Sequence, residues 1–217
     1  GVAFNGTGNL PLDSIGPSMF CYLNSPALRN GDKVNATPYF IAEIYDESGI
    51  NATGQGIGHN MTLIIDGKTT MTYDLNDSFC FDYGSYQSGK VGYVLPTLEA
   101  GEHKLMFRSW DVLNNSSTAE LSFVVDEHSM PSVYDINVSE NPVRSTATFI
   151  VTHDRAGAQV EVEIEIFDLS GRKLATTKTT EVASGNTTLV RWDACTVGGS
   201  AMTTGEYLYR ARTPTTE

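Results

Sequence analysis

The sequence predicts an all-β fold made of two tandem immunoglobulin-like antiparallel β-sandwiches. Short apolar runs alternate along the whole chain with turns rich in Gly, Asn and Asp, and no stretch shows the period of an amphipathic helix. The pattern is clearest at residues 39–66, where apolar runs at 39–45 and 61–65 flank a long connection rich in Gly, Asn and Ser. Two core strands joined by a decorated loop produce such a pattern.

Length and charge limit the function classes. The chain has 217 residues, enough for two ordinary domains, and carries a formal net charge of -12 at pH 7. A chain this acidic is a poor partner for nucleic acid or for an anionic membrane surface, because both attract Lys and Arg. We see neither a signal peptide nor a membrane-spanning apolar run, and because the chain begins Gly1-Val2 we expect a fragment of a longer precursor.

The three cysteines, Cys21, Cys80 and Cys195, are too few and too scattered for a disulfide framework or a zinc site. We expect buried or half-buried free thiols, with a bridge between Cys21 and Cys80 as the alternative. No nucleophile elbow, phosphate-binding loop or metal-ligand run is present, so the sequence indicates no catalytic residue, no cofactor and no metal ligand set.

The first predicted domain occupies residues 17–127, after an arm at 1–16 that is rich in Gly, Asn and Pro. Asp66-Gly67 predicts a tight hairpin turn. Residues 76–89 predict a polar excursion that carries aromatic residues. The strands expected in this domain lie at residues 19–23, 39–45, 61–65, 69–75, 91–95, 103–112 and 119–125. In 103–112, alternation places Leu105, Phe107 and Ser109 on one face and Met106, Arg108 and Trp110 on the other.

A polar linker is expected at 128–132, followed by a second domain at 133–217. Its run at 160–169, VEVEIEIFDL, has the clearest period of two in the chain. Val and Ile occupy one face, which Asp168 continues, and the other face carries Glu161, Glu163, Glu165 and Phe167. We expect the acidic face to be solvated. The strands expected in this domain lie at residues 134–138, 147–152, 160–169, 173–180, 187–192 and 207–211.

Five ordered blocks in the second domain resemble a known family of small immunoglobulin-like domains. The blocks are Asn141-Pro142, the residues 148–150 (TFI), 166–172 (IFDLSGR), 191–193 (RWD) and 204–210 (TGEYLYR). Similar domains end flagellar-hook-capping proteins and proteins exported by the type IX secretion system of Bacteroidetes. That family continues after the last block with a final basic strand, which we do not find before residue 217.

Five sequence blocks in the first domain resemble a more specific group of proteins. The segments at 46–51 (DESGIN), 56–59 (GIGH), 75–77 (LND), 86–89 (YQSG) and 108–117 (RSWDVLNNSS) resemble the region that follows the peptidase domain in PorU-type sortases, which are gingipain-type (C25) cysteine peptidases of type IX secretion. The catalytic Cys and His of that family lie upstream of this region. The resemblance therefore implies a fragment with no activity of its own.

The resemblance also implies a partner and a place. We expect a non-catalytic module at the cell surface or outer membrane, exported through the periplasm, whose last domain docks on a barrel-type outer-membrane secretion protein. We expect no nucleic-acid partner and no direct insertion into the membrane, and a monomer for the fragment. Strands around Phe167 and Tyr207 are the first choice for the docking edge, because strand addition needs only an exposed edge. The alternative is a carbohydrate-binding or adhesive sandwich pair of a surface protein.

Several residues have both a functional and a structural interpretation. Asp46, Asn51 and Asp111 have the donor chemistry of Ca²⁺ ligands, although Asx turns explain them equally well. His59 is expected to order its loop through a hydrogen bond. Trp110 and Trp192 are expected to be packed with their indole N–H groups bonded locally, and the alternative is an exposed aromatic residue that binds sugar. The Asn-x-Ser/Thr triplets, including those at Asn114 and Asn115, reflect composition, and Asp13-Ser14-Ile15 resembles a short O-glycosylation acceptor of Bacteroidetes.

Overall fold

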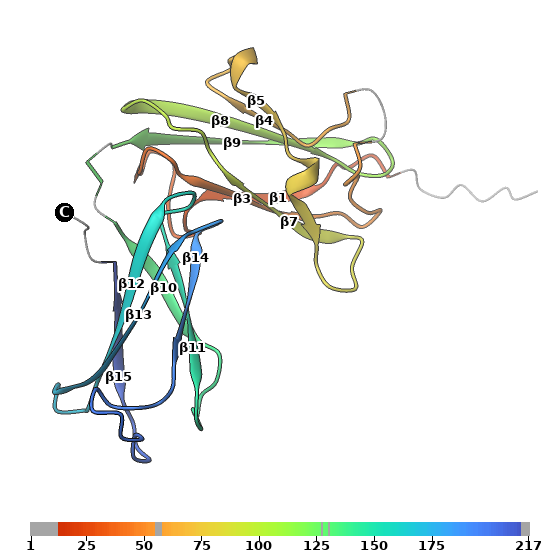
Figure 1. The fold of residues 1–217 in the computed structure, drawn as a ribbon. Helices are drawn as coiled ribbons and strands as arrows, with labels where there is room; N and C mark the ends of the chain where they lie inside the picture. The colour runs from red at the N-terminus through yellow and green to blue at the C-terminus, as the bar shows by residue number, and fades with distance from the viewer. Residues whose placement is uncertain (1–12, 55–57, 127, 130, 214–217) are drawn as a thin grey trace, which may run out of the picture. The chain divides into compact units, whose positions relative to one another are not determined.

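The computed structural model describes residues 13–54, 58–126, 128–129 and 131–213 (Figure 1). Its described part is almost entirely β, and its helical pieces are two short 3-10 turns, η1 (Thr69–Met71) and η2 (Asn76–Ser78). The all-β sandwich prediction is confirmed. None of the described helices has the length and apolar character needed to cross a membrane. Most of the predicted arm at 1–16 and the end of the chain at 214–217 lie outside the described residues.

Two sheets are built from the first part of the chain, with strand orders β1-β3-β7-β6 and β2-β9-β8-β4-β5. Core-facing residues alternate along the strands, as predicted for β8, where Leu105, Phe107 and Ser109 are buried and the residues between them are half-buried. The strands are β1 (Ser18–Leu23), β2 (Lys33–Val34), β3 (Tyr39–Tyr45), β4 (Thr62–Ile65), β5 (Thr72–Asp74), β6 (Phe79–Phe81), β7 (Ser88–Val94), β8 (Gly101–Trp110) and β9 (Ser116–Val125).

Two three-stranded antiparallel sheets are built from the second part, with orders β10-β11-β14 and β13-β12-β15. Phe149, Val151, Val162, Ile164 and Val190 belong to the core cluster that these sheets share. Burial of such aliphatic and aromatic side chains is the main term that stabilises the pair. The strands are β10 (Val133–Val138), β11 (Ala147–His153), β12 (Gln159–Phe167), β13 (Lys173–Val182), β14 (Thr187–Trp192) and β15 (Leu208–Arg212).

The contacts group the chain into two compact units. Unit 1 contains residues 1–20, 42–91 and 105–120, and unit 2 contains residues 21–41, 92–104 and 121–217. The predicted boundaries at 17–127, 128–132 and 133–217 stay a prediction. Within unit 2, the amide of Asn35 donates a hydrogen bond to the Asp154 carbonyl at 2.8 Å, and Asn186 donates one to the Asn24 carbonyl at 2.9 Å.

The predicted turn at Asp66-Gly67 is confirmed, and the strand after it is shorter than expected. Both residues have positive φ, as a type I′ turn requires, and Lys68 N–H donates to the Ile65 carbonyl. Residues 69–71 then form η1 instead of strand, because Met71 N–H bonds back to the Lys68 carbonyl at 3.0 Å. Only Thr72–Asp74 pair with β4.

Two short strands were not predicted from the sequence. β6 lies inside the excursion expected at 76–89, where it pairs with β7. β2 has two residues and pairs with β9 in parallel, so the antiparallel prediction is wrong for this one pair. Neither segment is long enough to show a period of two, so only the partner strand identifies it.

The predicted strand at 160–169 ends early, at Phe167. Asp168 accepts backbone hydrogen bonds from Ser170 and Arg172 at 3.0 Å each, and these bonds close the turn into β13. A hydrogen bond from the Ser170 hydroxyl and those backbone donors lower the pKa of Asp168 to about 2. Asp168 therefore ends the strand instead of continuing its apolar face.

Candidate functional site

The outer face of β12 carries the three predicted acids, and basic side chains from both neighbouring strands cover them. Arg210 of β15 donates two hydrogen bonds to one Glu165 oxygen, at 3.0 and 2.6 Å. Lys173, at the start of β13, approaches the other Glu165 oxygen at 3.2 Å. Arg212 binds Glu163 at 2.6 Å, and Lys178 binds Glu161 at 3.2 Å.

Glu165 corrects the expectation of a solvated acidic face, because only 3% of its surface is exposed. The hydrogen bonds from Arg210, followed by the one from Lys173, hold the pKa of Glu165 below its usual value. Cross-strand pairing places these cations opposite the acids, since Glu165 lies opposite Arg210 in the register and Glu163 lies opposite Arg212. The ion pairs therefore fasten β15 to the middle of its sheet.

β15 is also the last strand of its sheet. No described strand pairs with its outer edge. Leu208 is 53% exposed and Tyr209 is 43% exposed, although the Tyr209 ring packs edge-on against Phe149 with 5.2 Å between ring centres. An edge strand with exposed apolar side chains is a template for adding a further strand.

The strands around the two residues predicted to mark the docking edge are neighbours in one sheet, and only one of them is an edge strand. Phe167 ends the central strand β12 and pairs with Leu208, so it does not lie on an edge. Tyr207 directly precedes the edge strand, and its hydroxyl donates to the Thr203 carbonyl at 2.6 Å. Whether this edge binds a partner stays a prediction.

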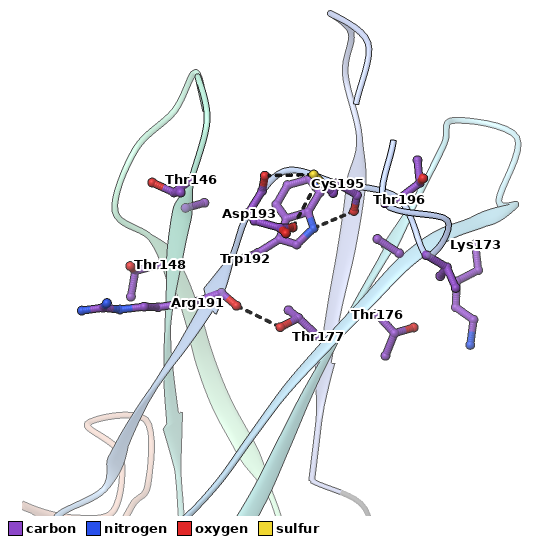
Figure 2. Close-up of a pocket in the computed structure, with 14 residues that line it drawn as sticks. Thr146, Thr148, Lys173, Thr176, Thr177, Arg191, Trp192, Asp193, Cys195 and Thr196 are labelled. Atoms are coloured by element: carbon purple, nitrogen blue, oxygen red, sulfur yellow. Dashed lines mark hydrogen bonds between the residues drawn. The ribbon is translucent and has the colours of Figure 1, made fainter. Parts of the chain in front are cut away.

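A crevice of about 950 Å³ opens at the other side of the same pair of sheets, between the ends of β11, β13 and β14 (Figure 2). Trp192 lines it, and the indole N–H donates to the Cys195 carbonyl at 3.1 Å, as expected for this residue. The other lining residues are Thr146, Ala147, Thr148, Lys173, Ala175, Thr176, Thr177, Arg191, Asp193, Cys195, Thr196, Val197 and Gly199.

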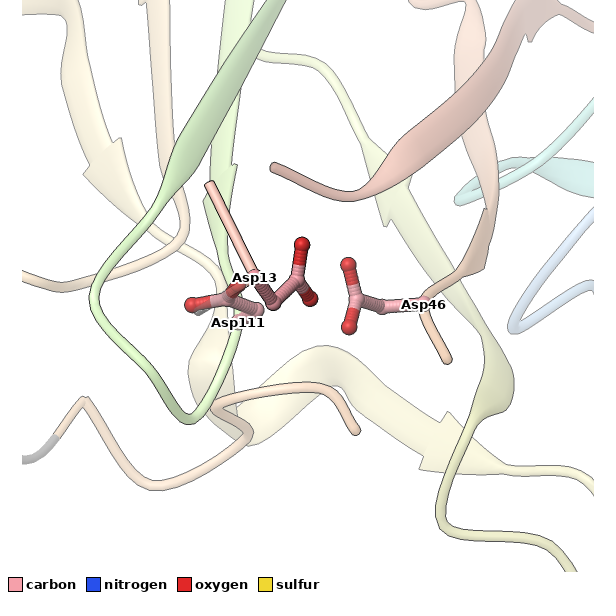
Figure 3. A group of neighbouring side chains, drawn as sticks. All are labelled: Asp13, Asp46 and Asp111. Atoms are coloured by element: carbon pink, nitrogen blue, oxygen red, sulfur yellow. The ribbon is translucent and has the colours of Figure 1, made fainter. Parts of the chain in front are cut away.

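In unit 1, three carboxylates meet where β3 and β8 end (Figure 3). One oxygen each from Asp13, Asp46 and Asp111 lies within 4.8 Å of the others. Asp46 and Asp111 are buried, at 6% and 0% exposure. The Asp46 carboxylate accepts hydrogen bonds from the backbone N–H groups of Ser48 and Gly49 at 2.8 and 3.2 Å. The Asp13 carboxylate accepts a hydrogen bond from the Ser48 side-chain hydroxyl at 2.5 Å.

The three carboxylates of this group repel one another when they are charged. Burial, together with the negative charges of Asp111 and Asp13, raises the pKa of Asp46, whereas the Ser48 hydroxyl lowers that of Asp13. Hard oxygen donors such as these suit Ca²⁺, and the group could hold such an ion. Asp46 and Asp111 were singled out from the sequence. Asp13 was not, because it lies far from both in the chain and only folding brings it near.

The backbone of Asn51, the third predicted ligand, donates to the Trp110 carbonyl at 2.9 Å. Its place among the Ca²⁺ ligands stays a prediction. Asp111 accepts backbone hydrogen bonds from Leu113 and Asn115, at 2.9 and 2.7 Å. The Asx-turn interpretation therefore describes what Asp46 and Asp111 do within the protein.

The three cysteines are free thiols, so the alternative bridge between Cys21 and Cys80 does not form. Cys21 and Cys195 are half-buried as expected, whereas Cys80 is exposed, so the expectation of burial is wrong for that residue. Burial raises the pKa of the Cys21 thiol to about 12, and burial followed by the nearby Asp193 raises that of Cys195. A raised pKa leaves little thiolate at neutral pH, which makes both thiols poor nucleophiles.

Two histidines are engaged in structural contacts. His153 is fully buried and bonded to the Thr188 hydroxyl at 3.0 Å and to the Arg155 backbone N–H at 3.1 Å. The His59 ring packs against Trp110, with 4.2 Å between ring centres, and its buried Nδ1 has no hydrogen-bond partner among the described residues. The buried Trp110 indole N–H likewise has no partner in the part of the chain that the structure describes, so the local bond expected for Trp110 is not found there.

Comparisons with known proteins identify a relative among the solved structures. No family model and no curated protein matches this chain. Among solved structures, it is similar to dimeric latent PorU from Porphyromonas gingivalis, with 35% sequence identity and a TM-score of 0.60. The match covers 94% of this chain and 19% of PorU.

A second match, to the β-glucuronidase of Parabacteroides merdae, has 10% identity and a TM-score of 0.30, and covers 91% of this chain and 23% of that one. The match to PorU shows that the chain is related to a region that makes up about a fifth of PorU.

Proposed function

We propose that this chain is a non-catalytic interaction module of a PorU-type sortase at the bacterial cell surface. In this proposal a C25-type cysteine peptidase domain precedes it in the parent protein. The module docks the parent on a barrel-type outer-membrane protein of type IX secretion. The likeness to PorU at 35% identity supports the family, and the raised pKa values of Cys21 and Cys195 argue against either of these two thiols as a nucleophile.

The observation that carries the docking proposal is the outer edge of β15. Its apolar residues Leu208 and Tyr209 are about half exposed, at 53% and 43%, while ion pairs at Glu165 hold the strand in place from its inner side. A strand that is firmly paired on one side and open on the other can accept a partner strand without unfolding. Backbone hydrogen bonds then supply affinity, and Leu208 and Tyr209 supply apolar contact.

The test compares two exposed leucines on edge strands. Leu208 lies on β15, and Leu189, which is 55% exposed, lies on β14, the last strand of the β10-β11-β14 sheet. The full chain is immobilised and exposed to solubilised outer-membrane proteins of a bacterium with type IX secretion. A captured barrel protein is purified, and its affinity is then measured for the unsubstituted chain, Leu208→Lys and Leu189→Lys.

We expect Leu208→Lys to weaken binding by about tenfold or more, because a charge on the edge discourages strand pairing. Leu189→Lys should leave the affinity unchanged within about twofold. Equal losses in both variants would place docking elsewhere, and failure of the unsubstituted chain to bind any barrel protein would reject the proposed function.

A further inference from the structure

Two carboxylates of unit 1 point into the interior between strands, where apolar side chains are the rule. Just after β3, the Asp46 backbone N–H still donates to the Gln87 carbonyl at 2.8 Å, and just after β8, Asp111 still pairs with Ile50. The alternation of each strand therefore continues for one more residue. It turns Asp46 and Asp111 inward, in agreement with their exposures of 6% and 0%.

No positively charged side chain was found to compensate these carboxylates. Among the ion pairs that the described residues form, none includes Asp13, Asp46 or Asp111. The hydrogen-bond donors found for the three are neutral, namely backbone N–H groups, the Ser48 hydroxyl and the Asn115 amide. Buried charges in proteins are normally paired with an opposite charge or coordinate a metal ion.

A second observation at the same place is the side chain of Ser109. This residue is 0% exposed, and its hydroxyl has no hydrogen-bond partner in the part of the chain that the structure describes. Ser109 precedes Asp111 by two residues, so alternation directs its hydroxyl to the same interior as the Asp111 carboxylate. On its other side this face of β8 continues with the apolar residues Phe107 and Leu105. A buried hydroxyl normally has a partner, so Ser109 indicates a missing ligand beside the carboxylates.

The spacing of the carboxylates fits a single Ca²⁺ ion. One oxygen from each of the three aspartates lies within 4.8 Å of the other two (Figure 3). Ca²⁺ binds oxygen at about 2.3–2.6 Å, so two oxygens on opposite sides of the ion are about 4.6–5.2 Å apart. The three aspartates can therefore contribute to one coordination sphere. Mg²⁺ usually keeps several of its waters, which makes it a poorer match for buried protein ligands.

We propose that the three aspartates bind one Ca²⁺ ion and that the hydroxyl oxygen of Ser109 is a fourth ligand. Asp13 precedes β1, and the Asn115 amide already donates to its backbone carbonyl at 3.1 Å. The ion would hold this segment against the ends of β3 and β8. The inference does not depend on docking through β15, so either can fail without the other.

The test uses the full chain, freed of metal with a chelator and titrated with CaCl₂ or MgCl₂ to about 10 mM in a calorimeter. We expect a Kd for Ca²⁺ of about 1 mM or lower, and a Kd for Mg²⁺ at least about tenfold higher. Near saturation the Tm should rise by about 5 °C. Hydrogen exchange at the amides of residues 14–16 should slow when Ca²⁺ is added, because the ion holds Asp13.

Two aspartates that accept backbone hydrogen bonds in similar turns provide matched variants. Asp46 belongs to the carboxylate group, whereas Asp168 accepts bonds from Ser170 and Arg172 in unit 2. Asp46→Asn should weaken Ca²⁺ binding by about tenfold or more, because the affinity of such sites depends on ligand charge. Asp168→Asn should leave the affinity unchanged within about twofold.

Ser109→Ala separates a metal ligand from a residue that only packs. We expect Ca²⁺ binding to weaken by about three- to tenfold, while the Tm of the metal-free protein does not fall. The metal-free protein loses only a hydroxyl that has no partner in the part of the chain described. A fall in the metal-free Tm with unchanged Ca²⁺ affinity would show that Ser109 is not a ligand.

Three results would overturn the metal site itself. The first is the absence of both binding heat and a Tm shift up to 10 mM Ca²⁺, a concentration that would detect a Kd of about 1 mM. The second is an equal loss of Ca²⁺ affinity in Asp46→Asn and Asp168→Asn. The third is Mg²⁺ binding that is as tight as Ca²⁺ binding.

Discussion

Two acidic clusters in this chain have opposite electrostatic settings. On β12, Glu161, Glu163 and Glu165 are covered by Lys and Arg from the adjacent strands. In unit 1, Asp13, Asp46 and Asp111 gather within 4.8 Å and are held by hydroxyl and backbone N–H donors. The pKa of Glu165 is lowered and that of Asp46 is raised.

The difference teaches that burial alone does not set the cost of a carboxylate. Glu165 and Asp46 are buried to similar degrees, at 3% and 6% exposure. The charged form of Glu165 is stabilised because it receives hydrogen bonds from cations, whereas the charged form of Asp46 faces other negative charges. The ion pairs of the β12 glutamates stabilise the pairing of β15 with β12. The three aspartates repel one another, and binding of a proton or a cation would relieve that repulsion.

The largest effect is expected for Glu165→Gln, which removes the charge that Arg210 and Lys173 bind. We expect the free energy of unfolding to fall by about 2 kcal/mol, the size of a hydrogen bond to a charged group. The more exposed pair of Glu161 with Lys178 provides the control, since Glu161→Gln should cost only about 0.5 kcal/mol. Urea denaturation measures both losses of unfolding free energy. Equal losses for Glu165→Gln and Glu161→Gln would show that burial does not strengthen the ion pairs of Glu165.

A smaller effect of opposite sign is expected for Asp46→Asn. The new amide oxygen can still accept the Ser48 and Gly49 N–H groups, while repulsion from Asp13 and Asp111 disappears. The free energy of unfolding should rise by about 1 kcal/mol at pH 7, measured in metal-free buffer with a chelator. Destabilisation under these conditions would contradict the repulsion. A gain that is lost when Ca²⁺ is added would indicate that the carboxylates bind the ion.

The smallest expected effect is the pH dependence of the two changes in unfolding free energy, the one caused by Glu165→Gln and the one caused by Asp46→Asn. The folded pKa of Glu165 is lowered, so its stabilising contribution is present above about pH 4.5 and is lost as pH falls below that value. The folded pKa of Asp46 is raised, so its destabilising contribution is relieved as pH falls toward 3.8. Denaturation curves between pH 7 and 3 should show both differences shrinking, with opposite signs. A difference that stays constant would exclude titration of that carboxylate.

Much of the fold could be predicted because local patterns specify it. The alternation in β8 and β12 identified their core faces, and Asp66-Gly67 identified a hairpin turn. The short strands β2 and β6 escaped notice because two or three residues carry no period. Residues 69–71 were assigned to a strand although a local turn bond makes them helical.

The candidate sites were less predictable, since they depend on residues far apart in the chain. Asp46 and Asp111 were expected to converge, but Asp13 joins them only through folding. The residues that line the crevice come from three strands and a loop, and only folding brings these segments together. Of the two strands expected at the docking edge, the one that ends at Phe167 is central and the one that follows Tyr207 is at the edge, because the sequence of a single strand does not specify its neighbours in the sheet.

By itself the sequence determined the β-class, most strand positions, the alternation that buries Val and Ile, and the likeness to PorU-type proteins. These follow from local period, turn chemistry and ordered residue blocks. Only the tertiary structure decided that Glu165 is buried under Arg210, that β15 lies at an edge, and that three carboxylates share one place. The physical reason is that charge compensation and strand neighbours are long-range properties, set by which segments pack together.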